Sequence, residues 1–278
     1  MLGLIIFMRM WVPKVGHGGL TPFEDPLSQH TEQPPGLITM TMSDTTFSAA
    51  VESIQREYAA LGHSLGWRFL CVSKQVLLRD PKIVFLTLNP GGRSIPEDHP
   101  SESCESGCSY VVEHWWKSLP GQHKLQRQVQ RLFAEIHRHA GPTGQATVSL
   151  DASLIGYFVP FRSPRFADLH RTKESLAFAN DLWASLLAPL RPRLLLSIDP
   201  MTFRSMKSLC TAQGGTLVSA ETLPTGWGAV TAEVHEYQFS DRSTMLVRLP
   251  HLSTFQLFSR SECKEPVEAI LARGCRHL

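Results

Sequence analysis

Three short apolar runs, each followed by a helical pattern, constrain the fold more than any other feature of the chain. The first is "KIVFLTL" at residues 82–88, the second lies within 148–161 and stops at Pro160, and the third lies within 191–199. Continuous apolar runs of this length are typical of strands that are buried on both faces of a parallel sheet. Because helices alternate with these strands, the chain is predicted to form a three-layer α/β/α sandwich with a mostly parallel central sheet.

The remaining segments predict the helices and a closing hairpin. Helical periodicity and capping residues predict helices within residues 44–58, 109–119, 123–141, 172–190, 200–210 and 262–274. Two segments of alternating polarity, 228–239 and 243–252, are predicted to form an antiparallel hairpin. Residues 1–41 are predicted to be an irregular leader, because much of this stretch is rich in Pro and Gly and lacks periodicity. A single α/β domain is expected at 42–278.

Charge and cysteine content set broad limits on the function. The net charge is only +2, which neither establishes nor excludes nucleic acid as a partner. The six cysteines do not complete a zinc or iron–sulfur set, so we expect free thiols, no metal and no cofactor. Free thiols favour a reducing compartment such as the bacterial cytoplasm. The apolar run at the N-terminus is broken by Arg9 and is too short to span a membrane.

Four loops follow the ends of predicted strands or precede the helices after them, where open α/β sheets bind their ligands. They span residues 89–92, 157–165, 199–201 and 250–255. The first contains Asn-Pro-Gly-Gly directly after a buried strand, and its glycines allow a backbone to approach a ligand closely. Each motif alone is also typical of an ordinary turn. Their shared position is what predicts a binding or catalytic site.

Two of these motifs together resemble those of the uracil-DNA glycosylase superfamily. Asn89-Pro90-Gly91 ends the first strand, and a His-x-Ser motif at 251–253 ends the last one. Members of that superfamily carry an Asn-Pro-Gly or Asp-Pro-Tyr motif first and a His-Pro-Ser-like motif near the end. The order of elements matches over about residues 80–275. The resemblance implies a DNA glycosylase, which hydrolyses the N-glycosidic bond of a base flipped out of DNA and leaves an abasic site.

The resemblance also implies roles for individual residues. Asn89 would orient the attacking water without accepting its proton, because an amide is not a base, and His251 would donate a hydrogen bond to the departing base. Ser253 would contact a phosphate, and Phe255 would fill the space that the flipped nucleotide leaves. The implied base pocket comprises Pro90, Gly91, Tyr110, Tyr157, Phe158 and Phe161. The implied DNA-binding residues are Gly92, Arg162, Arg165, Ser253, Phe255 and Arg260.

Two departures from the superfamily pattern indicate an unusual target base. Tyr157 falls in or near the position where uracil-specific members carry an asparagine, and the loop at 93–109 is longer and acidic, with Glu97, Asp98, Glu102 and Glu105. Acidic side chains could bind the hydroxyls of a sugar on the base. We therefore expect a modified pyrimidine, such as glucosylated hydroxymethylcytosine in phage DNA, and a role in phage defence. A repair glycosylase for uracil or another deaminated base and a non-catalytic nucleic-acid-binding module are the alternatives. An unrelated α/β enzyme such as a nucleotide-binding hydrolase is disfavoured, because the sequence lacks a phosphate-loop lysine motif and a GxGxxG motif after a strand. DNA is the expected partner, with no membrane and no obligate protein partner.

Overall fold

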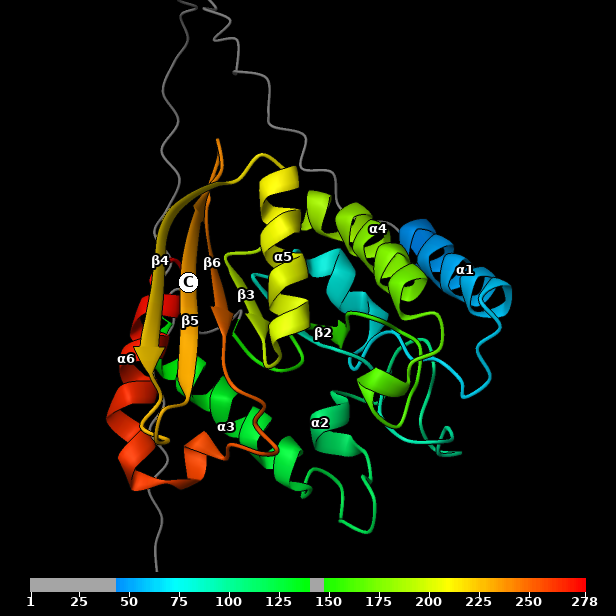
Figure 1. Cartoon of the computed structure of the whole chain (residues 1–278), viewed down its shortest axis with the longest axis horizontal. Helices are drawn as coiled ribbons and strands as arrows, with labels where there is room; N and C mark the ends of the chain where they lie inside the picture. Colours follow the sequence, from blue (N-terminus) through cyan, green and yellow to red (C-terminus); the bar gives the residue numbers. More distant parts are fainter. Residues whose placement is uncertain (1–43, 141–147) are drawn as a thin grey trace, which may run out of the picture. The chain divides into compact units, whose positions relative to one another are not determined.

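A computed structural model describes residues 44–140 and 148–278, so the predicted leader at 1–41 lies outside the described residues. Four parallel strands form one side of a six-stranded sheet, in the order β2 (Leu154–Tyr157), β1 (Ile83–Thr87), β3 (Leu194–Ser197) and β6 (Ser243–Arg248) (Figure 1). All residues of β1 and β3 are buried, which matches their continuous apolar sequences. The prediction of a mostly parallel α/β sheet is confirmed.

The other side of the sheet is antiparallel. β5 (Thr231–Gln238) pairs with β6 as the predicted hairpin, and β4 (Thr216–Pro224) pairs with β5 at the edge. The sequence did not indicate β4, because its residues alternate between exposed and half-buried positions without a buried apolar face. Its membership of the sheet depends on backbone pairing with β5, which periodicity does not reveal.

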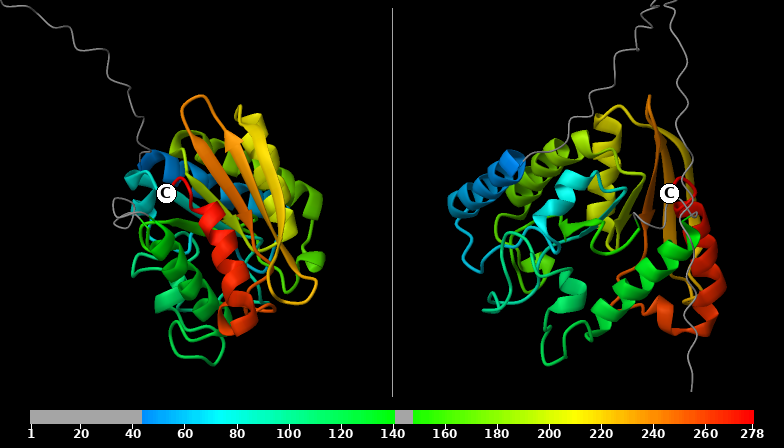
Figure 2. Two further views of the ribbon diagram at one scale, coloured as in Figure 1. Left: turned by 90° about the vertical axis from the view of Figure 1, so that its left-hand side faces the viewer. Right: turned by 180° about the vertical axis from the view of Figure 1, so that it is seen from behind.

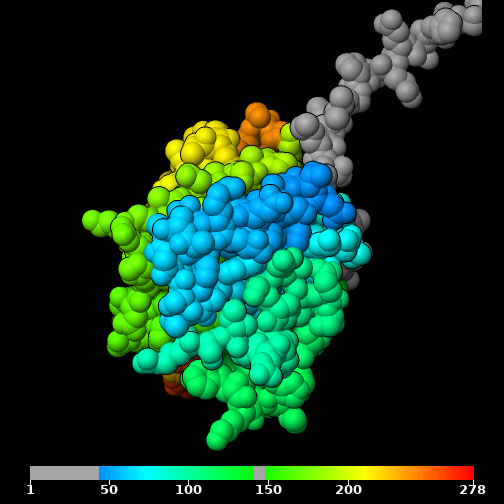
Figure 3. Space-filling view, turned by 90° about the vertical axis from the view of Figure 1, so that its right-hand side faces the viewer, coloured from blue at the N-terminus to red at the C-terminus, as the bar shows by residue number. Residues whose placement is uncertain are grey.

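Helices cover both faces of the sheet (Figures 1 and 2). α1 (Asp44–Ala60), α4 (Thr172–Leu190) and α5 (Pro200–Ala212) lie on one face, and α3 (Lys124–His139) and α6 (Lys264–Gly274) lie on the other. Figure 3 shows α1, in blue, on the outside of the first group. Short 3₁₀ helices lie at Lys74–Arg79, Phe166–Asp168, Leu257–Ser259 and Ser261–Cys263. The three layers follow the prediction.

The helix predicted at 109–119 is mostly wrong. Only α2 (Ser109–Val112) forms, and the backbone becomes extended at Glu113. The Glu113 side chain turns into the protein and pairs with Arg68, so a buried ion pair outweighs the helical propensity of the segment. Beyond it Trp116 adopts a left-handed backbone conformation with φ of 58°, which is rare for an aromatic residue.

One close contact explains how β2 joins the core. A Cβ at Gly156 would lie 2.8 Å from the carbonyl oxygen of Phe69, so only glycine allows this approach. Trp183 of α4 packs there and donates its Nε1–H to the carbonyl oxygen of Phe158 at 2.9 Å.

All six cysteines are buried free thiols. Within the described ranges, no helix has the length and apolar character needed to cross a membrane.

Candidate active site

A cavity of about 910 Å³ opens at the carboxyl ends of the parallel strands. This is where the sequence predicts a site, and all four predicted loops contribute to the wall. They do so through Asn89, Gly91, Gly92, Tyr157, Arg162, Asp199, His251 and Ser253. Segments that are far apart in the sequence therefore meet at one edge of the sheet.

The register of the sheet relates Asn89 to His251. Leu86, Ser197 and Arg248 lie side by side in β1, β3 and β6. Asn89 and His251 each follow this row by three residues, on the two strands that flank β3. Because neighbouring strands are about 4.8 Å apart, the two residues begin about 10 Å apart at their backbones, with the cavity between their side chains.

The side chain of Asn89 is held by its amide nitrogen. Nδ2 donates hydrogen bonds to Ser163 Oγ at 2.8 Å, to the carbonyl oxygen of Pro90 at 3.2 Å and to that of Phe161 at 3.4 Å. Two of these partners are carbonyl oxygens, which only accept, so the orientation of the amide is set. The carbonyl oxygen Oδ1 has no hydrogen bond among the described residues and is the acceptor that the cavity wall offers.

The ring of His251 is oriented by Ser253. Its Nδ1 lies 2.8 Å from Ser253 Oγ, and when the serine hydroxyl donates to Nδ1, Nε2–H is the donor at the cavity. His251 is exposed at the cavity opening, but the surrounding wall removes water from the ring and lowers its pKa, and the charge of Lys124 lowers the pKa further. Leu252, between His251 and Ser253, is fully buried and anchors the loop.

The glycine loop has one strained position and one open position. Gly92 has φ of +95°, which residues other than glycine rarely adopt, whereas a Cβ at Gly91 would meet no atom within 4 Å. The guanidinium of Arg162 donates to the carbonyl oxygen of Gly91. Arg162 is only 7% exposed, so it holds this loop from inside. Arg162 also lines the cavity, and its contact with a DNA phosphate stays a prediction.

Three residues predicted for the base pocket do not line the cavity. Phe158 and Phe161 are fully buried in the core, and Phe161 stacks on Phe178 with ring centroids 5.5 Å apart. Their prediction as pocket residues was wrong, because both rings are enclosed in the core, where Phe161 also packs against Tyr58 of α1. Pro90 is also buried and is not among the residues that line the cavity. Its carbonyl oxygen accepts a hydrogen bond from the backbone N–H of Ser163 at 3.2 Å.

Three residues predicted to bind DNA also lie outside the cavity wall. Phe255 is half-buried and packs edge-on against Trp227, with ring centroids 5.9 Å apart. Arg260 lies over the same Trp227 ring at 4.3 Å. Arg165 is exposed and pairs with Asp168 at 2.9 Å. A protruding apolar wedge at Phe255 is therefore not what the structure shows.

The two predicted tyrosines do line the cavity. Tyr110 is buried against Trp115, with ring centroids 5.0 Å apart, and Tyr157 ends β2 beside Asn89. Burial raises the pKa of both hydroxyl groups, and the nearby Cys71 raises them further. Both tyrosines thus stay neutral and can donate or accept a hydrogen bond.

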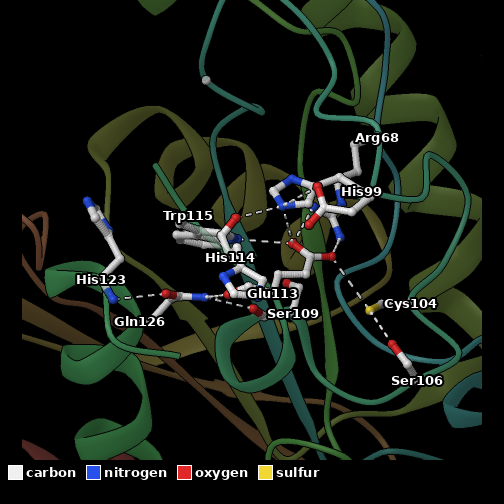
Figure 4. Close-up of polar contacts among 12 residues, drawn as sticks. Arg68, His99, Cys104, Ser106, Ser109, Glu113, His114, Trp115, His123 and Gln126 are labelled. Carbon is white, nitrogen blue, oxygen red and sulfur yellow. Dashed lines mark hydrogen bonds and ion pairs between the residues drawn. The ribbon is translucent and has the colours of Figure 1, made fainter. Parts of the chain in front are cut away.

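A buried ion pair between Arg68 and Glu113 supports the cavity wall, and no local sequence pattern predicts it (Figure 4). Arg68 and Glu113 are 2% and 5% exposed, and Arg68 Nη1 donates to Glu113 Oε2 at 2.8 Å. The same carboxylate accepts from Trp115 Nε1 at 3.0 Å and lies 3.6 Å from His99 Nε2. Arg68, His99 and Trp115 all line the cavity.

Trp116 stands at the cavity wall with an exposed fraction of 87%. Leu119, three residues later, is 71% exposed, so this segment turns two large apolar side chains toward solvent. By contrast, the acidic residues predicted to bind a sugar, Glu97, Asp98, Glu102 and Glu105, are absent from the cavity lining. That part of the prediction was wrong, because their loop presents Pro96 and His99 to the cavity instead.

Asp199 was overlooked as a site residue, although its loop was predicted to belong to the site. It caps α5, since Oδ1 accepts from the backbone N–H of Thr202 at 2.7 Å. The Asp-Pro pair after a predicted strand indicates such a helix start. It does not reveal that Asp199 lines the cavity or that its Oδ2 is buried without a hydrogen-bond partner. Burial raises the pKa of this carboxyl group.

No group of three or more His, Cys, Asp or Glu side chains that could hold a metal ion occurs in residues 44–140 and 148–278. The donors and acceptors at the cavity wall are amide, imidazole, hydroxyl, guanidinium and carboxylate groups. No protein-family model matches the chain, and no curated protein matches it.

Proposed function

We propose that the protein is a DNA glycosylase that hydrolyses the N-glycosidic bond of a flipped base and leaves an abasic site. The observation that carries the proposal is the convergence of Asn89 and His251 on one cavity from two strands that flank β3. An acceptor for water and a donor for the departing base are the two groups that this hydrolysis needs.

The geometry of the two side chains fits these roles. Nε2–H of His251 donates to a carbonyl oxygen of the base and stabilises the negative charge that grows as the bond to the sugar breaks. Oδ1 of Asn89 accepts a hydrogen bond from a water molecule and directs it toward C1′ of the sugar. The loss of one such donor typically lowers a rate by about 10²–10³-fold.

Contacts to duplex DNA are assigned to residues around the opening. Arg93 and Lys124 are exposed at the cavity and bind phosphates. Trp116 takes the role that the sequence predicted for Phe255, because it is exposed at the cavity wall and Phe255 is packed against Trp227. An apolar wedge of this kind stabilises DNA from which a nucleotide has been flipped.

The target is a modified pyrimidine. Pockets of about 300–1,000 Å³ hold drug-sized ligands, so a cavity of about 910 Å³ has room for a base with a sugar-sized substituent. Tyr157 offers one hydroxyl at the wall, in place of the paired donor and acceptor of an asparagine. Glucosylated hydroxymethylcytosine in phage DNA is a modified pyrimidine with a substituent of this size. With that substrate, the proposed role of the protein is phage defence in the bacterial cytoplasm.

The test is base release from defined duplexes. Duplexes that carry cytosine, uracil, hydroxymethylcytosine or glucosylated hydroxymethylcytosine are incubated with the protein, and abasic sites are detected by strand cleavage in alkali. We expect abasic sites at the glucosylated base. Release of uracil alone would establish the repair enzyme instead, and binding to all duplexes without release from any would favour the non-catalytic module.

A further inference from the structure

Asp199 lies between the two residues to which the proposed function assigns the chemistry. It follows β3, the strand between those that carry Asn89 and His251, and it comes two residues after Ser197 in the row formed by Leu86, Ser197 and Arg248. Asn89 and His251 come three residues after the same row. The carboxylate therefore approaches the cavity from the middle of its base.

The carboxylate has one engaged oxygen and one oxygen without a partner. Oδ1 accepts from the backbone N–H of Thr202, whereas Oδ2 is buried without a hydrogen-bond partner. Asp199 itself lines the cavity. Asp199 is only 8% exposed, and a buried polar atom without a hydrogen bond is unfavourable by about 1–3 kcal/mol. Capping the helix requires one oxygen only, so it does not account for the position of the second.

We propose that Asp199 is the general base of the reaction, an inference that rests on the proposed function. The water held by Asn89 Oδ1 gives a proton to Asp199 Oδ2 as its oxygen forms a bond to C1′. The bond between C1′ and the base nitrogen breaks, and its electron pair leaves with the base, to which His251 donates a hydrogen bond. The base then takes a proton from solvent, and Asp199 returns its own proton to solvent.

The chemistry of the wall supports this assignment. Asn89 orients water but cannot accept a proton, so hydrolysis through Asn89 and His251 alone lacks a base. Burial raises the pKa of Asp199 above the ordinary value of 3.8, which makes the carboxylate a stronger base. The hydroxyl group of Thr202, the backbone N–H groups of Thr202 and Met201, and the charge of Arg248 on β6 oppose this rise. Other charged or titratable groups on the cavity wall are Arg68, Arg93, His99, Tyr110, His123, Lys124, Tyr157, Arg162 and His251.

The test is single-turnover base release by Asp199→Asn. Asparagine caps helices as well as aspartate does, so this variant removes the basic oxygen and keeps the hydrogen bond to Thr202. Asp199→Ser is the second variant, because serine also caps and carries no carboxylate. Thermal unfolding and DNA binding are measured for both, with the duplexes described above.

We expect either variant to release base about 10²–10⁴-fold more slowly than the wild type, with unchanged affinity for DNA. The wild-type rate rises with pH through the ionisation of Asp199, and this rise disappears in Asp199→Asn. Release within threefold of the wild-type rate by a folded variant would overturn the role of Asp199 and leave the glycosylase intact. Failure of the wild type to release any base would overturn both proposals.

Discussion

Removing one partner of the Arg68–Glu113 ion pair tests how the cavity is held together. Both residues are almost fully buried, and they join the segment before β1 to the segment after α2. Substitution Glu113→Leu leaves the guanidinium of Arg68 buried without its carboxylate. Substitution Arg68→Met leaves the carboxylate with the hydrogen bond from Trp115 Nε1, the weak one from Cys104 Sγ and the longer contact with His99 Nε2.

The expected magnitude follows from burial. Breaking a buried ion pair from one side destabilises a protein by about 3–5 kcal/mol, and each kcal/mol lowers the melting temperature of a domain of this size by about 2–4 °C. Each single variant should therefore melt about 6–20 °C lower than the wild type. The double variant Arg68→Met, Glu113→Leu should be more stable than either single variant, because neither charge remains buried alone.

Urea unfolding of the wild type, the two single variants and the double variant measures the coupling free energy between Arg68 and Glu113 in a double-mutant cycle.

The pH dependence of the free energy of unfolding provides a second check. Burial alone would raise the pKa of Glu113, but the hydrogen bonds and charge of Arg68 outweigh burial and lower it below 4.5. The pair thus stabilises the protein at pH values above 4.5, and this contribution disappears as the pH falls through the lowered pKa. Single variants that cost less than 1 kcal/mol, or stabilities that add in the double variant, would refute this reasoning.

Three other expectations concern the cavity itself. Trp116→Ala should slow base release from duplex DNA by about 5–150-fold, the value of one base–aromatic stack, and should leave release from single strands and the urea midpoint unchanged. Gly92→Ala should destabilise the protein by about 1–2 kcal/mol, because the backbone at Gly92 has a positive φ. Gly91→Ala should leave the stability unchanged, and equal effects of the two substitutions in urea unfolding would contradict this expectation. NMR titration should give His251 a pKa below 6.5, and Lys124→Gln should raise that pKa; no change would remove Lys124 as a cause.

The sequence predicts those parts of the fold and site that follow from strand order. β1 and β3 are visible as apolar runs, and parallel strands end at one edge of a sheet. The loops after β1 and β6 were therefore predicted to lie at the same edge of the sheet. The cavity wall at that edge contains both Asn89 and His251. The prediction required no knowledge of side-chain positions.

Other features depend on contacts that local patterns do not encode. The rings of Phe158 and Phe161 point into the core because of how the chain leaves β2, which periodicity does not determine. Arg68 and Glu113 are 45 residues apart in irregular segments, so nothing local indicates their pairing. Local propensity predicts a helix that continues through Glu113 to Trp116. In the structure α2 ends before Glu113, the partner of Arg68, and Trp116 lies at the cavity wall.

Single-turnover base release by Asn89→Ala tests most directly whether this cavity cleaves the bond between sugar and base. Asn180→Ala is the matched control, because among the described residues the Asn180 amide bonds only to the carbonyl oxygen of Leu176 in α4. On the duplex from which the wild type releases its base, we expect Asn180→Ala to match the wild type and Asn89→Ala to be at least about 10²-fold slower. Equal rates for all three proteins would contradict the assignment of the cavity as the active site.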